Sequence, residues 1–382
     1  MYRLNRNKMK KLIYADNAAT TKLDKEAFEA MKPYLLDEYG NASQPYFFGI
    51  AAKDAIKEAR NTIAGCIGAQ PEEIYFTSGG TESDNWAIKG SAFADSEKVA
   101  TITSQIEHHA VLNACAAVER LGYPVAYLPV NSEGIIEAKA LAKIMTMETR
   151  LVSIMLANNE IGSIEPIKDL CDLTHEHGAV FHTDAVQAAG HIAINVRELG
   201  VDMLSASAHK FNGPKGIGFL YIKKGTNIRP FNDGGAQEFG MRAGTENVAS
   251  IVGMAVALKN NVSEINTNKC HLLSLEDLLL SRISDLDYVR NGADDHIPGN
   301  MSLSFKGANG EALLHRLDLR GICISTGSAC DSVNTQISHV LQAIKLDRSY
   351  AKGTIRISLG KYNTEDDVIQ IANVLKQIIR AK

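Results

Sequence analysis

The chain has 382 residues, a formal net charge of −4, 45% hydrophobic residues and 22% charged residues. This length suits two domains of ordinary size, and the composition is typical of a globular protein with a substantial core. The small negative charge argues against nucleic acid as a partner, and no apolar stretch of the sequence approaches the ~20 residues that span a membrane.

The N-terminus is basic, but no apolar segment follows it, so it predicts a solvated tail rather than a secretory signal. Met9 fits as a start codon as well as Met1. The cysteines are scattered and form no C-x-x-C pair. This spacing argues against a metal site held by this chain alone and against a disulfide scaffold. We therefore expect a reducing compartment, the cytoplasm.

Short apolar runs alternate with helical patterns through the middle of the chain. Such alternation favours an α/β fold in which helices cover both faces of a mostly parallel sheet. In chain order we expect strand 74–77, helix 81–89, strand 99–103, helix 110–121, strand 151–157, helix 167–177 and strands 179–182, 202–205 and 218–222.

A long helix is predicted at 248–262, and the pattern changes after it. Thr364 is a plausible N-cap for the last helix, because Asp366 and Asp367 follow in its first turn. We therefore predict a smaller α+β domain from about residue 260 onward. Its expected elements are helix 273–283, strand 301–305, helix 310–319, strands 321–324 and 354–359, and helix 365–381.

The segment Gly79-Gly80-Thr81 lies between a predicted strand and a predicted helix. Glycines allow a tight turn, and the start of a helix offers unpaired N–H groups and a positive dipole end to an anion. Thr81 adds a hydroxyl. Most Gly-Gly turns bind nothing, so this segment alone leaves both a phosphate site and a plain turn open.

Asp184 and Lys210 each follow a predicted strand, where open α/β sheets place their ligands. A carboxylate there could hold a ring nitrogen protonated, although a helix N-cap is the simpler interpretation of a lone Asp. A partly buried lysine could form an imine, although a solvated loop lysine is equally open. Ser207 and His209 flank Lys210 as candidate phosphate donors.

Cys330 lies among small residues in the segment Gly327-Ser328-Ala329-Cys330-Asp331, which predicts a mobile loop. A thiolate is the reactive form, so exposure would matter more than packing, but an incidental cysteine stays possible. The glycine turn, the acid, the lysine and the thiol occur in this order along the chain. Together they indicate a chemistry more specifically than any one of them does alone. Pyridoxal 5′-phosphate needs the first three as a phosphate anchor, a partner for its ring nitrogen and an amine for its aldehyde.

These segments resemble cysteine desulfurases of the NifS/IscS type, in the class V aminotransferase-like branch of the fold-type I pyridoxal-phosphate enzymes. The resemblance runs in family order from about residue 14 to the C-terminus. No single segment is specific, but the set is highly so. The matching segments are 15–21, 78–85, 107–111, 158–162, 205–216, 242–247, 325–330 and 355–360.

The resemblance implies a large cofactor-binding domain at 14–258, with a mostly parallel seven-stranded sheet. It also implies a smaller α+β domain at 259–382, against which residues 1–13 pack and which carries the cysteine loop near 325–335. The active unit would be a homodimer.

The resemblance also implies a role for each candidate residue. Lys210 would carry pyridoxal 5′-phosphate as a Schiff base and move protons at the substrate Cα. Asp184 would pair with the pyridine nitrogen, Gln187 would bond the ring hydroxyl, and His108 would stack on the ring and assist proton transfers. The remaining assignments are Gly80, Thr81, Ser207 and His209 for the phosphate, Thr245 for the phosphate of the partner subunit, Asn159 for the cofactor, and Asn159 with Arg356 for the substrate carboxylate.

The implied reaction takes L-cysteine to L-alanine and leaves a persulfide on Cys330. The sulfur would pass to an acceptor protein such as an iron–sulfur scaffold, or to thio-cofactor or tRNA-thiolation enzymes, and Cys330 could contact a transferred cluster. A lyase for selenocysteine or cysteine sulfinate stays open, because such enzymes need less from the loop thiol. A transaminase and a sulfur-carrier subunit without catalysis are more distant alternatives.

The chain departs from the family near its N-terminus. The family commonly has a Pro-Ser-Ser-x-His run, and here the aligned segment is Asn41-Ala42-Ser43-Gln44-Pro45-Tyr46. Tyr46 therefore replaces the usual histidine. The change bears on the pocket entrance and on partner choice, and on none of the roles above.

Overall fold

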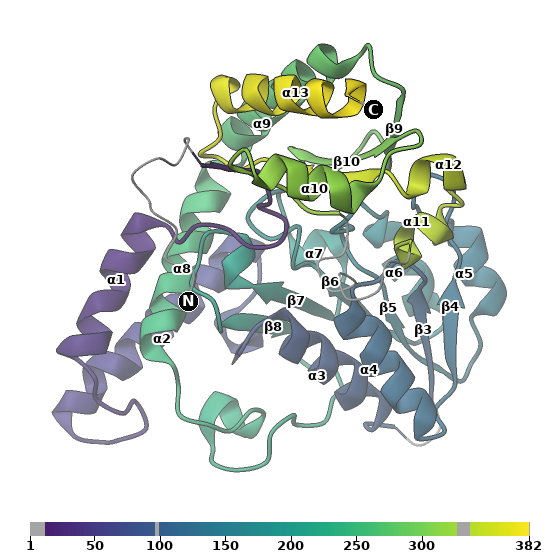
Figure 1. The fold of residues 1–382 in the computed structure, drawn as a ribbon. Helices are drawn as coiled ribbons and strands as arrows, with labels where there is room; N and C mark the ends of the chain where they lie inside the picture. Colours follow the sequence, from purple (N-terminus) through teal and green to yellow (C-terminus); the bar gives the residue numbers. More distant parts are fainter. Residues whose placement is uncertain (1–11, 96–98, 327–336, 382) are drawn as a thin grey trace.

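The structure is a computed structural model that describes residues 12–95, 99–326 and 337–381 (Figure 1). The predictions for the basic N-terminal tail and for the loop of Cys330 lie outside these residues. Among the described helices, none is both long and apolar enough to cross a bilayer.

A seven-stranded sheet forms the centre of the molecule, in the order β2-β8-β7-β6-β5-β3-β4. The five strands from β7 to β4 in this order pair in parallel, whereas β8 runs antiparallel to both of its neighbours. The predicted α/β fold with a mostly parallel sheet is confirmed. The strands are β2 (Ile74–Thr77), β3 (Ala100–Ser104), β4 (Val125–Leu128), β5 (Thr149–Ser153), β6 (Val180–Asp184), β7 (Met203–Ser207) and β8 (Gly218–Ile222).

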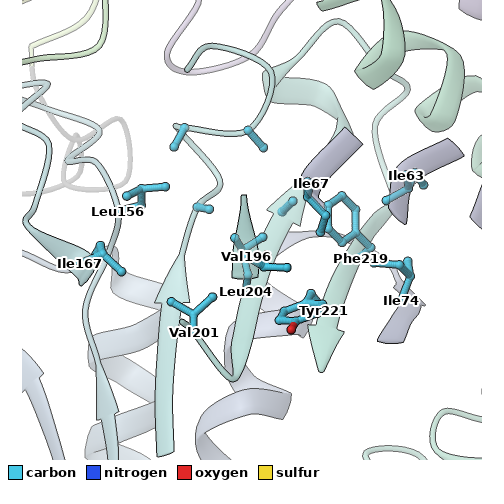
Figure 2. Packing of buried hydrophobic residues seen from close by; sticks show 14 of the residues in the cluster. Ile63, Ile67, Ile74, Leu156, Ile167, Val196, Val201, Leu204, Phe219 and Tyr221 are labelled. Carbon is cyan, nitrogen blue, oxygen red and sulfur yellow. The ribbon is translucent and has the colours of Figure 1, made fainter. Parts of the chain in front are cut away.

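Helices cover both faces of this sheet (Figure 1). Side chains alternate between the faces along each strand, so neighbours in the sequence belong to different cores. Leu151 and Met203 pack with Trp86 of α3, whereas Leu204 and Phe219 face the opposite side, among the residues of Figure 2. The helices up to residue 263 are α1 (Lys25–Leu36), α2 (Phe47–Ile67), α3 (Gly80–Ala92), α4 (His109–Arg120), α5 (Ala138–Ile144), α6 (Ile167–Glu176), α7 (Val196–Leu199) and α8 (Val248–Ser263).

The C-terminal part has a separate apolar core that joins α9 and α13 to a three-stranded antiparallel sheet in the order β12-β10-β9. Thr364 caps α13 as predicted. The limits 14–258 and 259–382 for two domains stay a prediction. The elements here are α9 (Ile265–Ile283), β9 (Tyr288–Asn291), β10 (Asn300–Phe305), α10 (Gly310–Asp318), β11 (Ile322–Cys323), α11 (His339–Ala343), α12 (Arg348–Ala351), β12 (Thr354–Ser358) and α13 (Glu365–Arg380).

The segment after β1 (Ile13–Tyr14) connects the two cores. β1 pairs in parallel with β11, and Asp16 forms a bridge with Ser358 at the end of β12. A few residues later, the amide of Thr21 donates to the carbonyl of His209. Residues 16–21 therefore lie between the C-terminal sheet and the lysine segment that follows β7.

The short turn Gln237–Gly240 is held by a buried ion pair. Glu238 and Phe239 both have left-handed backbones, with φ of 48° and 58°, which is strained for residues other than glycine. The Glu238 carboxylate accepts two hydrogen bonds of 2.8 Å from the Arg60 guanidinium and one from the amide of Phe76. These bonds stabilise the strained turn.

Replacing Glu238 with alanine is expected to destabilise the protein by about 3 kcal/mol, because it leaves the Arg60 charge buried without its partner. Urea-induced unfolding of the apoprotein measures the change. The matched control is Glu29→Ala, which breaks the exposed pair between Glu29 and Lys32 and should cost less than about 1 kcal/mol. Equal losses for the two variants would contradict this role for Glu238.

Candidate active site

A cavity of about 500 Å³ lies where β6 and β7 end and α3 begins. This is the edge at which open α/β sheets bind their ligands. The structure brings most of the predicted site residues into its lining, namely Gly80, Thr81, His108, Asn159, Asp184, Gln187, Ser207, His209, Lys210 and Arg356.

Lys210 ends the 3₁₀ turn that follows β7. Its Nζ donates to the carbonyls of Ala18 and Ala19, at 2.5 and 3.0 Å. Gln187 donates from Nε2 to the same Ala18 carbonyl, at 2.8 Å. The N-terminal turn therefore holds the amine within the cavity, at the place where an aldehyde could reach it.

The start of α3 forms a narrow cradle. Gly79 has φ of 148°, a conformation that favours glycine, and a Cβ at Gly80 would lie 2.6 Å from Cγ2 of Val186. Ser207, the last residue of β7, lies on the other side of the turn, with its Oγ 3.5 Å from the position of a Cβ at Gly79. The first N–H groups of a helix, beside a serine hydroxyl, are suited to an anionic group such as a phosphate.

Asp184 is the last residue of β6, whereas the sequence predicted it just past the end of a strand at 179–182, and no helix follows it directly. Its Oδ1 accepts the amide of Val186 at 2.9 Å. Burial raises the pKa of Asp184 to about 6, while the Val186 hydrogen bond and the charge of Lys210 oppose this rise. A cationic ring N–H would favour the ionised form still further.

Two histidines of the cavity are neutral. Burial lowers the pKa of His108 to about 4, and the charge of Lys210 adds to this effect. Its Nδ1 accepts the amide of Ala110 at 3.1 Å as the N-cap of α4, so the ring proton lies on Nε2. Burial likewise lowers the pKa of His209 to about 4, and its Nδ1 lies 3.1 Å from the Thr20 hydroxyl.

Arg356 of β12 reaches the same cavity from the C-terminal sheet. The side chain is 2% exposed, and its guanidinium donates to the Asn159 carbonyl and to Asp16, both at 2.9 Å. Its Nε has no hydrogen-bond partner within the part of the chain that the structure describes. A buried guanidinium N–H without an acceptor is suited to a carboxylate of a bound molecule.

Thr245 is the predicted site residue that the structure does not place in this cavity. It is exposed and lines separate hollows together with Gly244. Cys330 lies outside the described residues. Sequence reasoning missed the carbonyls of Ala18 and Ala19, which no side-chain motif indicates, and Asp84, a buried acid that also lines the cavity.

Comparison with known proteins agrees with this geometry. The family model Aminotransferase class-V matches residues 13–371. The chain belongs to the class V aminotransferase family. Within this family it is 50% identical to the cysteine desulfurase IscS of Dictyoglomus turgidum over 376 residues, which cover 97% of this chain and 95% of that relative.

Solved structures of the family show the same fold. A NifS-like protein superposes with a TM-score of 0.92 at 39% identity, covering 97% of this chain and all of that one. A second structure, described as SspA in complex with cysteine, has a TM-score of 0.82 at 38% identity and covers 92% of this chain and all of its own. The resemblance inferred from the motifs is therefore confirmed, with the cysteine desulfurases among this chain's near relatives.

Proposed function

We propose that the protein is a pyridoxal 5′-phosphate-dependent cysteine desulfurase, which converts L-cysteine to L-alanine and transfers the sulfur to Cys330. The observation that carries this proposal is that one cavity is lined by the lysine, the acid and the glycine turn that the cofactor needs, together with the buried Arg356. The IscS relative and the structure described with cysteine support the choice of substrate.

The residues present fit the cofactor. Asp184 would hold the ring nitrogen and Gln187 the ring hydroxyl, while Lys210 would bond the aldehyde. Gly80, Thr81, Ser207 and His209 would hold the phosphate, where the space beside Gly80 is too narrow for a side chain. When bound, pyridoxal phosphate supplies an electron sink for the negative charge that develops at the substrate Cα.

Arg356 would bind the substrate carboxylate through its Nε–H, for which the described part of the chain offers no acceptor. Its other N–H groups already donate to the Asn159 carbonyl and to Asp16. Asn159 and Asp16 therefore fix the plane of the guanidinium before the substrate arrives, which lowers the entropy lost on binding.

Lys210 and His108 would handle the protons. The Lys210 amine, once released from the carbonyls of Ala18 and Ala19, could remove the proton from the substrate Cα. The neutral His108 ring holds a proton at Nε2, which it could donate to the substrate or to a departing group. Because the pKa of His108 is about 4, this ring stays neutral across the physiological pH range.

The sulfur step balances without another reactant. The bond between the substrate Cβ and its sulfur breaks, the Cys330 thiolate forms a bond to that sulfur, and the electron pair left on Cβ takes up a proton. Alanine and a Cys330 persulfide result, so the thiol of Cys330 is oxidised as the substrate carbon is reduced. A reducing compartment, the cytoplasm, would keep Cys330 available as a thiol.

We also propose a homodimer. Thr245 is exposed and lies outside the cavity of its own chain, which fits a residue that completes the phosphate site of a second subunit. The persulfide would then pass to an acceptor protein such as an iron–sulfur scaffold.

The experiment that tests the activity supplies L-cysteine, L-selenocysteine or L-cysteine sulfinate to the pyridoxal-phosphate-loaded protein and measures alanine. The expected result is alanine from L-cysteine, with an equal amount of sulfide when a thiol reductant is present. No alanine from L-cysteine, but rapid release from selenocysteine or the sulfinate, would overturn the proposal. Amino-group transfer to a keto acid would instead reveal a transaminase.

Replacing Arg356 with lysine is expected to raise KM for L-cysteine about tenfold, and replacement with alanine about 100-fold, because a charge-assisted hydrogen bond contributes about 1.5–3 kcal/mol. Steady-state kinetics measures the change. The absorption band of the bound cofactor should stay, since Arg356 would contact the substrate and not the cofactor. An unchanged KM would contradict this role.

A further inference from the structure

A second carboxyl group, that of Asp84, lies near Asp184 in the lining of the cavity. Asp84 belongs to α3, which covers the face of the sheet toward which His182, Asp184 and Ser205 also point. Asp84 is 1% exposed and lines the same cavity. The function proposed above gives Asp184 a role and leaves Asp84 without one.

The polar groups around Asp84 form a buried chain. The ring of His182 lies between two hydroxyls, with Nδ1 2.9 Å from Ser153 and Nε2 2.9 Å from Ser205. Ser205 also hydrogen-bonds the Asp84 carboxyl. Burial lowers the pKa of His182 to about 3, so this ring carries no charge that could offset an anion at Asp84.

The Asp84 carboxyl lacks donors that an anion would need. Its Oδ1 lies 3.8 Å from His182 Nε2, beyond hydrogen-bond distance, and has no partner among the described residues. A buried charge without donors costs far more than a buried neutral acid. Burial and the neighbouring Asp184 accordingly raise the pKa of Asp84 well above its ordinary value.

Asp184 is the better place for the negative charge of the pair. It accepts the amide of Val186 and lies within the field of Lys210, whereas Asp84 is helped by Ser205 alone. Two carboxyls that share a buried site do not both ionise. The titratable groups that act on Asp84 from the elements packed around it are Asp184 of β6 and Glu107 of the turn before α4, beside the neutral His182.

We propose that Asp84 is a positioning residue that holds a proton as a neutral acid and so confines the negative charge of the pair to Asp184, at the floor of the cavity. This inference rests on the proposed function in one respect: the charge at Asp184 then serves the ring nitrogen of pyridoxal phosphate. The protonation of Asp84 itself is a property of the apoprotein.

The first experiment measures binding of pyridoxal 5′-phosphate to the apoprotein by ultrafiltration. Asp84→Asn is a neutral mimic of the acid, so it should bind the cofactor within about threefold of wild type. Asp84→Ala leaves a hole beside Asp184 and should bind about tenfold more weakly. Asp184→Asn removes the charge and should bind about 100-fold more weakly. We therefore expect Asp84→Asn to keep the cofactor affinity that Asp84→Ala loses.

The result that overturns the inference is an equal loss of affinity in Asp84→Asn and Asp184→Asn, since it would show that Asp84 carries charge. Wild-type affinity in Asp184→Asn would instead contradict the proposed cofactor site. The two failures are therefore distinguishable.

The second experiment needs no cofactor and follows the Tm of the apoprotein against pH. The pKa of Asp84 is raised in the folded protein, so the stability that its proton contributes is present at low pH and is lost as the pH rises above the ordinary aspartate range. Asp84→Asn has no such loss. The Tm of Asp84→Asn minus the Tm of wild type should therefore increase steadily as the pH rises.

Parallel Tm curves for the two proteins would overturn the inference. Glu165, a buried acid on which Asp84 does not act, is present in both proteins and cancels in the comparison. Should Asp84→Asn fail to fold, Ser205→Ala takes its place. Loss of the Ser205 hydrogen bond removes a contact that lowers the pKa of Asp84, so the fall in Tm, which begins in the ordinary aspartate range in both proteins, should continue to a higher pH in this variant than in wild type. An unchanged profile would count against the inference.

Discussion

Replacing Lys210 with alanine is expected to abolish covalent attachment of pyridoxal phosphate and to slow alanine formation by about 10³-fold or more. The amine is both the group that would bond the aldehyde and the base that would act at the substrate Cα. Its Nζ lies in the cavity, held by the carbonyls of Ala18 and Ala19. Among the described residues that line the cavity, no other has an amine held at this position.

Borohydride reduction followed by peptide mass analysis measures the attachment. Wild-type protein should retain the cofactor's mass on the peptide that contains Lys210, and the variant should not. The matched control is Lys215→Ala, because Lys215 lines the same cavity but is exposed. Labelling of the Lys210→Ala protein at another lysine, with activity preserved, would show that the assignment is wrong.

The second large effect is expected at Cys330. Cys330→Ser should keep the absorption band of the bound cofactor and its affinity, yet lose release of sulfide from L-cysteine. A hydroxyl cannot accept the substrate sulfur, whereas the residues that would hold the cofactor are unchanged. The variant therefore separates cofactor binding from sulfur transfer.

Cysteine-dependent sulfide production, with a thiol reductant present, is the measurement. Cys270→Ser is the control, because Cys270 is an exposed free cysteine of α9. It should behave as wild type. Unchanged sulfide release in Cys330→Ser would rule out the proposed acceptor. It would favour a lyase that acts on selenocysteine or cysteine sulfinate, since such an enzyme needs less from the loop thiol.

Local sequence patterns were sufficient to predict most strands of the large sheet. Strand β8 lies at Gly218–Ile222 as predicted, because a short apolar run between turn signals is distinctive. The patterns missed β4 and β9, whose residues are mostly partly exposed and so show no clear apolar run. They also missed α1 and α2, which precede the first predicted strand.

The site was predictable from the sequence only where several motifs and the family resemblance agreed. Gly80, Asp184 and Lys210 each carry a chemistry that a local motif indicates, and all three line the cavity. The role of Arg356 came from the resemblance alone. Its orientation is fixed by the carbonyl of Asn159 and the carboxylate of Asp16. These two residues are separated from Arg356 by 197 and 340 positions along the chain.

The sequence by itself determined the α/β fold, the family and the types of residue available for pyridoxal-phosphate chemistry, because these follow from local periodicity and short motifs. The tertiary structure alone decided how the two buried carboxyls of the site differ. Asp84 and Asp184 are identical side chains in the sequence, and the Val186 amide, the charge of Lys210 and the distance to His182 distinguish them. Solvation and hydrogen-bond geometry depend on contacts made across the sheet, and these contacts leave no local signal in the chain.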